Sequence, residues 1–493
     1  MPIDRHDAHE PVFVRSWNQT LTTILGIYLV LFSIALIVIM RVDAARERCP
    51  LLSTRNFFLV GIILFQSSSG AVTLLMGETE RGAELEDYTL PGLVFCTILT
   101  VFVALFLWLY RSLGVVDRLA LARTRIRTCS PSRLVWAGIL VTLIGITLRF
   151  AGMGIPYVAV LLPQLSAGCL CAGIALVATA WARSVFNLAI ASILAVTLVA
   201  SSATLLVGAF GRREIIGLFF SIVWALYFEK WRYMPVSRLF PRLTFAVAGL
   251  SLAVLVFSAS RVGGQNVDRS LGQQVERLLQ IEWENVQGRF FDAVSGQFAG
   301  GISMYLYDAR LKDSAYDPLH SLAYFVTLPI PRDFWPGKYE GLGFTAPDVA
   351  GVTRVADEFS WGPGLVGHLC NDIVFLSLPI YTIILAAAFK YMDVRAASSI
   401  RDPMTVAVFG SALGQGLGMP RGEIGLFAFN LLAAIVGAWL FSRIAARMFL
   451  PVDREAEFEE ASGEYDDLEG DAEYELSSEA EPDASGEQLR HMR

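Results

Sequence analysis

Long apolar stretches recur along the chain, and short polar or charged connectors separate them. Most stretches hold roughly 18 to 24 residues, enough for a helix rising about 1.5 Å per residue to cross a hydrocarbon core of about 30 Å. Helices are expected because backbone polar groups in lipid must be hydrogen-bonded within their own segment. The pattern therefore predicts an all-α integral membrane protein with about eleven transmembrane helices. We expect them at residues 20–40, 56–77, 91–110, 134–155, 158–181, 185–208, 214–229, 243–260, 365–389, 403–419 and 424–445.

The composition indicates the same class of protein. Hydrophobic residues make up 54% of the chain and charged residues 17%, and the mean hydropathy is +0.52, which lies outside the usual range of soluble proteins. No nucleic-acid partner is expected. The six cysteines fall in predicted spans or in short basic connectors, so we expect neither disulfides nor a thiolate metal site. No cleavable signal peptide is expected, because the first apolar segment is long and lacks a small-residue cleavage pattern.

The acidic residues gather at the C-terminal end of the chain. Residues 451–493 carry sixteen Asp and Glu against three Arg, so the net charge of −7 conceals a net positive remainder. Few large apolar residues and strong repulsion between like charges predict a disordered tail. This tail either solubilises the chain or binds a partner.

The connectors differ in charge, and this difference predicts an orientation in the membrane. "RVDAARERCPLLSTR" and "RSLGVVDRLALARTRIRTCSPSR" are rich in arginine, whereas "ETERGAELEDY" between them is acidic. The positive-inside rule places the basic connectors in the cytoplasm, with the N-terminal segment 1–19 outside and the tail 451–493 inside. We then expect about eight spans in residues 20–261, one large extracytoplasmic loop with short helices at 262–364, and about three spans in residues 365–450.

Basic residues that this topology leaves on the outer face are candidates for function. Arg212, Arg213 and Arg421 lie at short turns where predicted spans reach the outer surface, and Arg289 lies in the large loop. One interpretation is that these side chains extend to lipid headgroups. The other is that several converge on an anionic group of a membrane-borne substrate, such as a lipid-linked diphosphate, since guanidinium stays charged and binds phosphate oxygens in pairs.

The segment "LPIPRDFWPGKYEG", residues 328–341, supplies further polar and aromatic groups in the large loop. Its prolines stiffen an extended entry, because each fixes its own φ and disfavours helix in the preceding residue. Arg332 and Lys338 are cations, and Trp335 suits either a membrane-interface belt or stacking on a sugar ring. The alternative is a proline-rich turn that an interfacial tryptophan anchors.

These residues resemble a known family. The pattern P-R-x-x-W-P-x-K in "IPRDFWPGK" resembles the signature loop of bacterial oligosaccharide repeat-unit polymerases, the Wzy-type O-antigen polymerases. "GRFFDAVSGQF", with Arg289, resembles the helix that precedes this loop in the family. "DEFSWGPGLVG", with Glu358, Gly364 and Gly367, resembles the segment that follows it. "GRREIIGLFF" and "MPRGEIGLFAFNLL" resemble the arginine-bearing starts of two membrane helices.

The sequence also departs from the family pattern. Tyr339 stands where the family loop ends in proline, Asp357 replaces a glycine, and Pro363 precedes Gly364. The matching pieces run from about residue 211 to 435, and the long acidic tail is outside the pattern.

The resemblance implies a GT-C-like membrane glycosyltransferase of the bacterial inner membrane whose active site faces the periplasm. Such an enzyme moves a growing glycan from undecaprenyl diphosphate onto a new lipid-linked repeat unit, without a metal ion or other cofactor. Its partners would be polyprenyl-diphosphate-linked oligosaccharides, membrane lipid, a chain-length regulator and a flippase. For the base that activates the attacking hydroxyl we expect Glu358 first and His368 second. Substrate binding is assigned to Arg212, Arg213, Arg289, Arg332, Trp335, Lys338 and Arg421.

Three other functions stay open. An O-antigen ligase-type enzyme uses the same donor and a histidine, for which His320 or His368 is available. A polyprenyl-phosphate-sugar glycosyltransferase would bind a divalent cation through acidic residues such as "ELED", residues 84–87. A transporter or flippase would need charged residues or broken helices near the middle of the membrane. Gln415 and its neighbouring glycines interrupt one predicted span, but no internal repeat is visible.

Overall fold

The structure is a computed structural model. It describes residues 12–80, 82–121, 129–154, 158, 161–185, 187–206, 212–235, 237–239, 241–246, 249, 298–313, 318–349, 361–399 and 402–449. Within these ranges the chain is helical and forms no strand. Eight of the described helical segments are long and apolar enough to cross a membrane, which makes the chain an all-helical membrane protein.

The N-terminal half contains the longest run of membrane-length helices. Its elements are α1 (Val12–Ala45), α2 (Thr54–Ile62), the π-helical turn η1 (Ile63–Ser67), α3 (Ser68–Met76), α4 (Thr89–Ser112), α5 (Gly114–Leu121), α6 (Pro131–Gly154), α7 (Leu161–Arg183), α8 (Leu188–Leu206), α9 (Arg212–Glu229) and the 3₁₀ turn η3 (Trp231–Tyr233). The seven spans predicted between residues 20 and 229 all coincide with helices, and α2, η1 and α3 together form one of them.

In the C-terminal half, the described helices are mostly short, and α17 and α20 are the two of membrane length. The helices are α13 (Ala299–Asp313), α14 (His320–Thr327), α15 (Leu342–Val349), α16 (Gly364–Asn371), α17 (Val374–Ser398), α18 (Pro403–Gly410), α19 (Leu413–Gly418) and α20 (Ile424–Phe449). The predicted span 424–445 is α20. Most of the predicted span 243–260 lies outside the described residues.

Two predicted spans differ from the structure. The span expected at 365–389 is displaced: α16 ends at Asn371, Ile373 adopts a left-handed backbone (φ 63°), and the membrane-length helix is α17. The span expected at 403–419 is divided into α18 and α19. Here the hydroxyl of Ser221, on α9, donates a hydrogen bond to the carbonyl of Gly410 (3.1 Å), the last residue of α18. A side chain of another helix thus bonds a backbone carbonyl at the position where the helix breaks.

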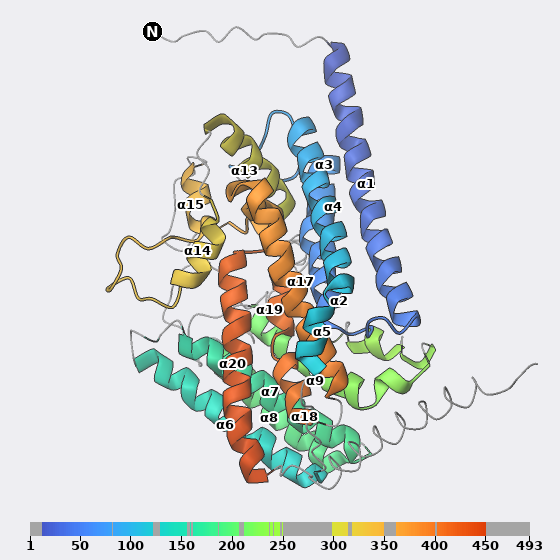
Figure 1. The fold of residues 1–493 in the computed structure, drawn as a ribbon, viewed down its shortest axis with the longest axis vertical. Helices are drawn as coiled ribbons and strands as arrows, with labels where there is room; N and C mark the ends of the chain where they lie inside the picture. The colour runs from blue at the N-terminus through green and yellow to red at the C-terminus, as the bar shows by residue number, and fades with distance from the viewer. Residues whose placement is uncertain are drawn as a thin grey trace, which may run out of the picture.

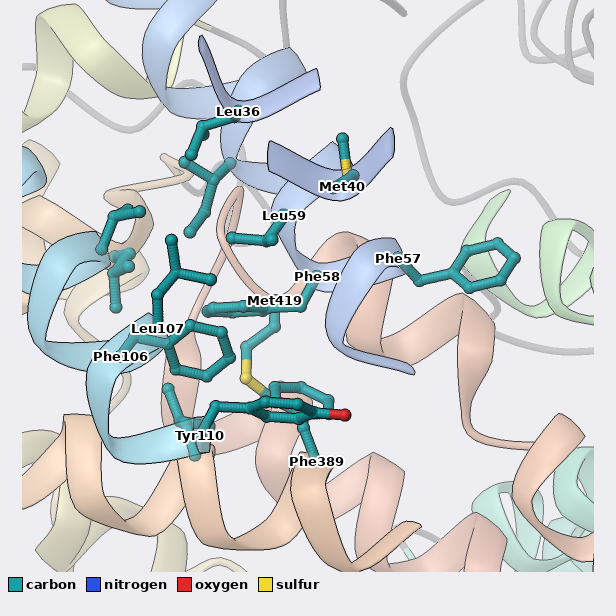
Figure 2. Close-up of a cluster of buried hydrophobic side chains, with 14 of the residues drawn as sticks. Leu36, Met40, Phe57, Phe58, Leu59, Phe106, Leu107, Tyr110, Phe389 and Met419 are labelled. Atoms are coloured by element: carbon teal, nitrogen blue, oxygen red, sulfur yellow. The ribbon is translucent and has the colours of Figure 1, made fainter. Parts of the chain in front are cut away.

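One hydrophobic core cluster lies where α2, α4 and α17 meet, and a second surrounds α7. The ring of Phe58 lies 5.2 Å from that of Phe106 and 5.0 Å from that of Phe389, measured between centroids, and Figure 2 shows these rings clustered with the side chains of Tyr110 and Met419. All three phenylalanines are almost fully buried. Aromatic side chains on three separate helices therefore hold this part of the bundle together.

Figure 1 shows the overall arrangement. Helices α1, α4, α17 and α20 run along the long axis of the molecule, and α6, α7 and α8 lie obliquely across its lower end. Helices α13 and α15 lie in the upper part of the molecule, and α14 lies below them, beside the start of α20. The upper end of the bundle thus brings the short helices of the large predicted loop beside the start of a membrane span.

Candidate functional site

Helix α16 carries His368 into the interior of the upper end. The helix begins at Gly364, whose φ of 66° is a left-handed conformation that favours glycine. A Cβ at this position would also collide with the side-chain amide of Gln66, which donates to the carbonyl of Pro420 (2.6 Å). Gln66 belongs to the π-helical turn η1, a type of turn that often marks functional sites. The start of α16 is therefore fixed against the turn that precedes α20.

Both ring nitrogens of His368 have polar neighbours. The backbone N–H of Ile424 donates to Nε2 (3.3 Å), and Nδ1 lies within hydrogen-bond distance of the hydroxyl of Ser321 (2.6 Å). Oε1 of Glu423 lies 3.4 Å from Nε2. The imidazole, which has no exposed surface, is thus held between α14 and the start of α20.

Glu423 is a buried carboxyl group at the start of α20. Its Oε2 accepts the backbone N–H of Gly343 (2.9 Å). Burial raises the pKa of Glu423 to about 8, with a smaller contribution from the charge of Asp372. Burial also lowers the pKa of His368 to about 4. Both groups are therefore mainly uncharged near neutral pH, and their contact is a short polar contact between neutral groups rather than an ion pair.

Asp372, at the end of α16, connects His368 to α17. Its Oδ2 accepts the backbone N–H of Ser321 (2.8 Å) and the hydroxyl of Tyr381 (2.5 Å), and its Oδ1 accepts the side-chain amide of Asn371 (2.9 Å). The aspartate thus accepts a hydrogen bond from the same serine whose hydroxyl contacts His368. This buried cluster links α14, α16, α17 and α20 through hydrogen bonds.

The segment 328–341 is closed by contacts within itself. Lys338 donates its ammonium to the carbonyls of Leu328 (3.3 Å) and Ile330 (2.7 Å), and Arg332 pairs with Glu340 (2.7 Å). Burial, followed by the charge of Arg332, lowers the pKa of Lys338. Both cations therefore brace the segment in this structure.

The same segment is fastened to the buried cluster at its C-terminal end. Nε2 of His320 lies 2.7 Å from the carbonyl oxygen of Glu340, and the ring of Tyr339 packs edge-on against His320 at 5.3 Å. The glycine turn that follows rests on Glu423 through the N–H of Gly343. The signature segment and the His368–Glu423 pair are therefore neighbours in space, although about 30 to 90 residues separate them in sequence.

The other predicted site residues differ in how much of each one the structure describes. Arg421 lies in the turn that leads to Glu423, and its guanidinium is 5.8 Å from the ring centre of Phe65. The side chain of Trp335, in the segment 328–341, is 44% exposed. Arg212 and Arg213 are the first residues of α9, which approaches α19 where Gly217 faces Gly414. The structure describes the backbone of these two arginines but not their side chains. Arg289 and Glu358 lie outside the described residues.

Sequence reasoning had named His368 but had missed Glu423, Ser321 and Tyr381. The available signal was the lone glutamate of "MPRGE" directly before an apolar span, where an unpaired carboxylate is costly. Asp372 reaches His368 through Ser321, which contacts both side chains. Within the described ranges, no three His, Cys, Asp or Glu side chains converge so that they could hold a metal ion.

Comparison with known proteins adds one partial similarity. The chain is 30% identical over 129 residues to a probable glycerol uptake facilitator protein of Thermotoga maritima. The match covers 25% of this chain and 55% of the facilitator, so the chain spans about half the length of the curated relative it matches. No protein-family model matches the chain, and no solved structure gives a significant match. The activity must therefore be argued from the site.

Proposed function

We propose that the protein polymerises lipid-linked oligosaccharide repeat units into a surface polysaccharide such as an O-antigen, a capsule or an exopolysaccharide. The observation that carries this proposal is the position of the buried His368–Glu423 pair beneath the segment 328–341. An acid–base pair and a loop with Arg332 and Trp335 are the groups that glycan transfer from a lipid diphosphate requires. The bacterial inner membrane is the proposed location, with this end of the bundle facing outward.

In the proposed reaction, a hydroxyl of the new lipid-linked unit attacks the anomeric carbon of the growing glycan. The new C–O bond forms as the bond to the polyprenyl diphosphate breaks, and the diphosphate leaves with the bonding electron pair. Glu423, in its carboxylate form, accepts the hydroxyl proton, because a base with a pKa near the working pH transfers protons most effectively. His368 positions the carboxyl. Arg421, two residues before Glu423 in the turn that leads to α20, would stabilise the leaving diphosphate.

Glu358 stays the alternative base, since it lies outside the described residues. Substitution of each glutamate in turn distinguishes Glu423 from Glu358 as the base. Loss of polymer in Glu423→Gln with normal polymer in Glu358→Gln favours Glu423, and the reverse result favours Glu358.

Deletion of the gene followed by analysis of the polysaccharide tests the function itself. A single repeat unit left on the lipid carrier supports a polymerase, whereas full-length polymer retained on the carrier supports a ligase. Complementation with Glu423→Gln should reproduce the deletion at an unchanged membrane level of the protein. The matched control is Glu340→Gln, because the carboxyl of Glu340 is about 43% exposed and lies on the surface, paired with Arg332. A normal chain length in Glu423→Gln and Glu358→Gln alike would contradict the proposed site.

Passage of a small polar solute is a second candidate function. The divided helix α18–α19 favours it, together with the amide of Asn430 and Oε1 of Gln415, which are buried and make no hydrogen bond to any described residue. The partial similarity to a probable glycerol uptake facilitator points the same way. Glycerol-driven reswelling of proteoliposomes that is faster than in protein-free liposomes, and slowed by Asn430→Leu, would support this function. Equal rates with and without the protein would exclude glycerol passage.

A further inference from the structure

The segment 328–341 leaves the bundle at a depth that belongs to the membrane. Leu328, at its root, packs with Phe429 and Ala433 of α20. At 1.5 Å per residue these two residues lie about 8 and 14 Å along α20 from its first residue. The helix of 26 residues is about 39 Å long, roughly 9 Å more than the hydrocarbon core. If the excess is shared between both ends, the root of the segment lies within the outermost part of that core.

The surroundings of α14 agree with this depth. Tyr324 and Leu328 pack with Leu161 and Leu165 in the first turns of α7, which is itself a candidate membrane span. On its other side α14 exposes Val326, whose exposed fraction is 62%. An exposed aliphatic side chain beside two membrane spans is the expected arrangement for a short helix in contact with lipid.

The tip of the segment, residues 332–337, extends away from the bundle. Figure 1 shows the connection between α14 and α15 reaching away from the bundle beside the upper end of α20. Its exposed aromatic residues are Phe334, at 73%, and Trp335, at 44%. The contacts of Lys338 with Leu328 and Ile330 hold the tip to its root, so its direction is set by the fold.

We propose that the tip, residues 332–337, inserts into the lipid headgroup region of the membrane leaflet at the upper end of the bundle. Its partner is the phospholipid surface. Indole and phenyl rings favour the boundary between headgroups and acyl chains. Arg332, which is about half exposed while paired with Glu340, adds a guanidinium at the level of the lipid phosphates. This inference does not depend on the proposed glycan transfer.

Fluorescent labels that report depth test the proposal in full-length protein reconstituted into vesicles of phosphatidylcholine and phosphatidylglycerol. The parent variant carries Cys129→Ser, because the other five cysteines are buried. Phe334→Cys and Trp335→Cys place the label on the tip. Phe344→Cys is the matched control: it is 39% exposed and lies in α15, above the start of α20 in Figure 1. Using two tip positions keeps the test valid if one variant fails to fold.

The expected result is strong quenching of both tip labels by lipids with a headgroup nitroxide, with loss of quenching by aqueous iodide. The control label should show the opposite preference. Tip labels that iodide quenches as well as it quenches the control would overturn the proposal. So would equal lipid quenching at all three positions, or tip labels that become shielded only after a lipid-linked saccharide is added, which would assign the aromatic residues to sugar binding instead.

Discussion

Oε1 of Glu423 lies 3.4 Å from Nε2 of His368, and both side chains are buried where α16 meets the start of α20. This relationship predicts how the stability of the protein depends on pH. Burial raises the pKa of Glu423 from its ordinary 4.5 to about 8. Its contribution to stability is therefore complete below about pH 4.5, declines as the pH rises, and is lost above about pH 8. The unfolding temperature of the purified protein in detergent should fall over this range, and Glu423→Gln should reduce the fall.

His368 predicts the opposite slope on the acid side. Its pKa lies at about 4 instead of the ordinary 6.5, so its contribution is complete above about pH 6.5 and is lost as the pH falls through about 4. His368→Gln should flatten the acid side of the same unfolding curve. The control is Glu340→Gln, whose half-exposed carboxyl should leave both slopes unchanged. If the unfolding temperature of Glu423→Gln still falls between about pH 4.5 and 8, a different group titrates in this range.

Asp43 predicts unequal costs for the two ion pairs that it forms. Its carboxylate contacts Arg55 at 2.7 Å and Arg111 at 3.0 Å, but the Arg55 side chain is 1% exposed and that of Arg111 is 50% exposed. Asp43→Ala leaves a buried guanidinium without its carboxylate, which should cost about 3 to 5 kcal/mol. Arg111→Ala should cost less than about 1 kcal/mol.

Thermal unfolding of the two variants in detergent measures the difference. The double variant Asp43→Leu with Arg55→Leu should recover much of the stability that Asp43→Ala loses, because it removes both buried charges. Equal losses in Asp43→Ala and Arg111→Ala would show that the burial of Arg55 does not govern this network.

Gly364 predicts a position where alanine is not tolerated. Its left-handed backbone and the Gln66 amide beside it leave no room for a Cβ, so Gly364→Ala should cost more than about 1 kcal/mol and displace His368. Gly337→Ala is the control, because a Cβ there meets no atom within 4 Å. A lower unfolding temperature should be seen only in the first variant. Similar temperatures for both would contradict the described start of α16.

Lys338 predicts a brace within the segment 328–341. Lys338→Met removes both hydrogen bonds to Leu328 and Ile330, so chymotrypsin should cleave faster after Phe334 in detergent solution. Arg332→Gln breaks only an exposed ion pair and should change the cleavage rate much less. If the two variants are cleaved equally fast, the ammonium of Lys338 is not what holds the segment.

The sequence was sufficient to predict where most membrane helices lie, because lipid requires an uninterrupted apolar segment for each of them. It was not sufficient to predict the breaks near Ile373 and Ser411. The first depends on Asp372, whose carboxylate is bonded by Ser321 and Tyr381, and the second accompanies a hydrogen bond from Ser221 on α9. Contacts between distant helices decide these positions, and a local pattern of apolar residues carries no record of them.

The candidate site was predictable to a similar extent. His368 and the segment 328–341 stood out by residue type, whereas Glu423 acquires its raised pKa only when folding buries its carboxyl group, against the opposing effect of the Gly343 N–H that donates to it. The roles of Arg332 and Lys338 as substrate ligands stay predictions, since both side chains make their contacts inside the segment.

The division between α18 and α19 has a consequence for how the chain enters the membrane during synthesis. The two helices with their linker cover 16 residues, or about 24 Å of helix, which is shorter than the hydrocarbon core. The second of them contains three glycines and Gln415. Such a segment partitions poorly into lipid alone and needs neighbouring helices to cover its backbone, and α18 and α19 pack on α2, α7 and α9 as well as on α20. Residues 403–418 should therefore enter the bilayer against helices that are synthesised before them, and the same residues placed without α2, α7 and α9 should stay accessible to a water-soluble reagent.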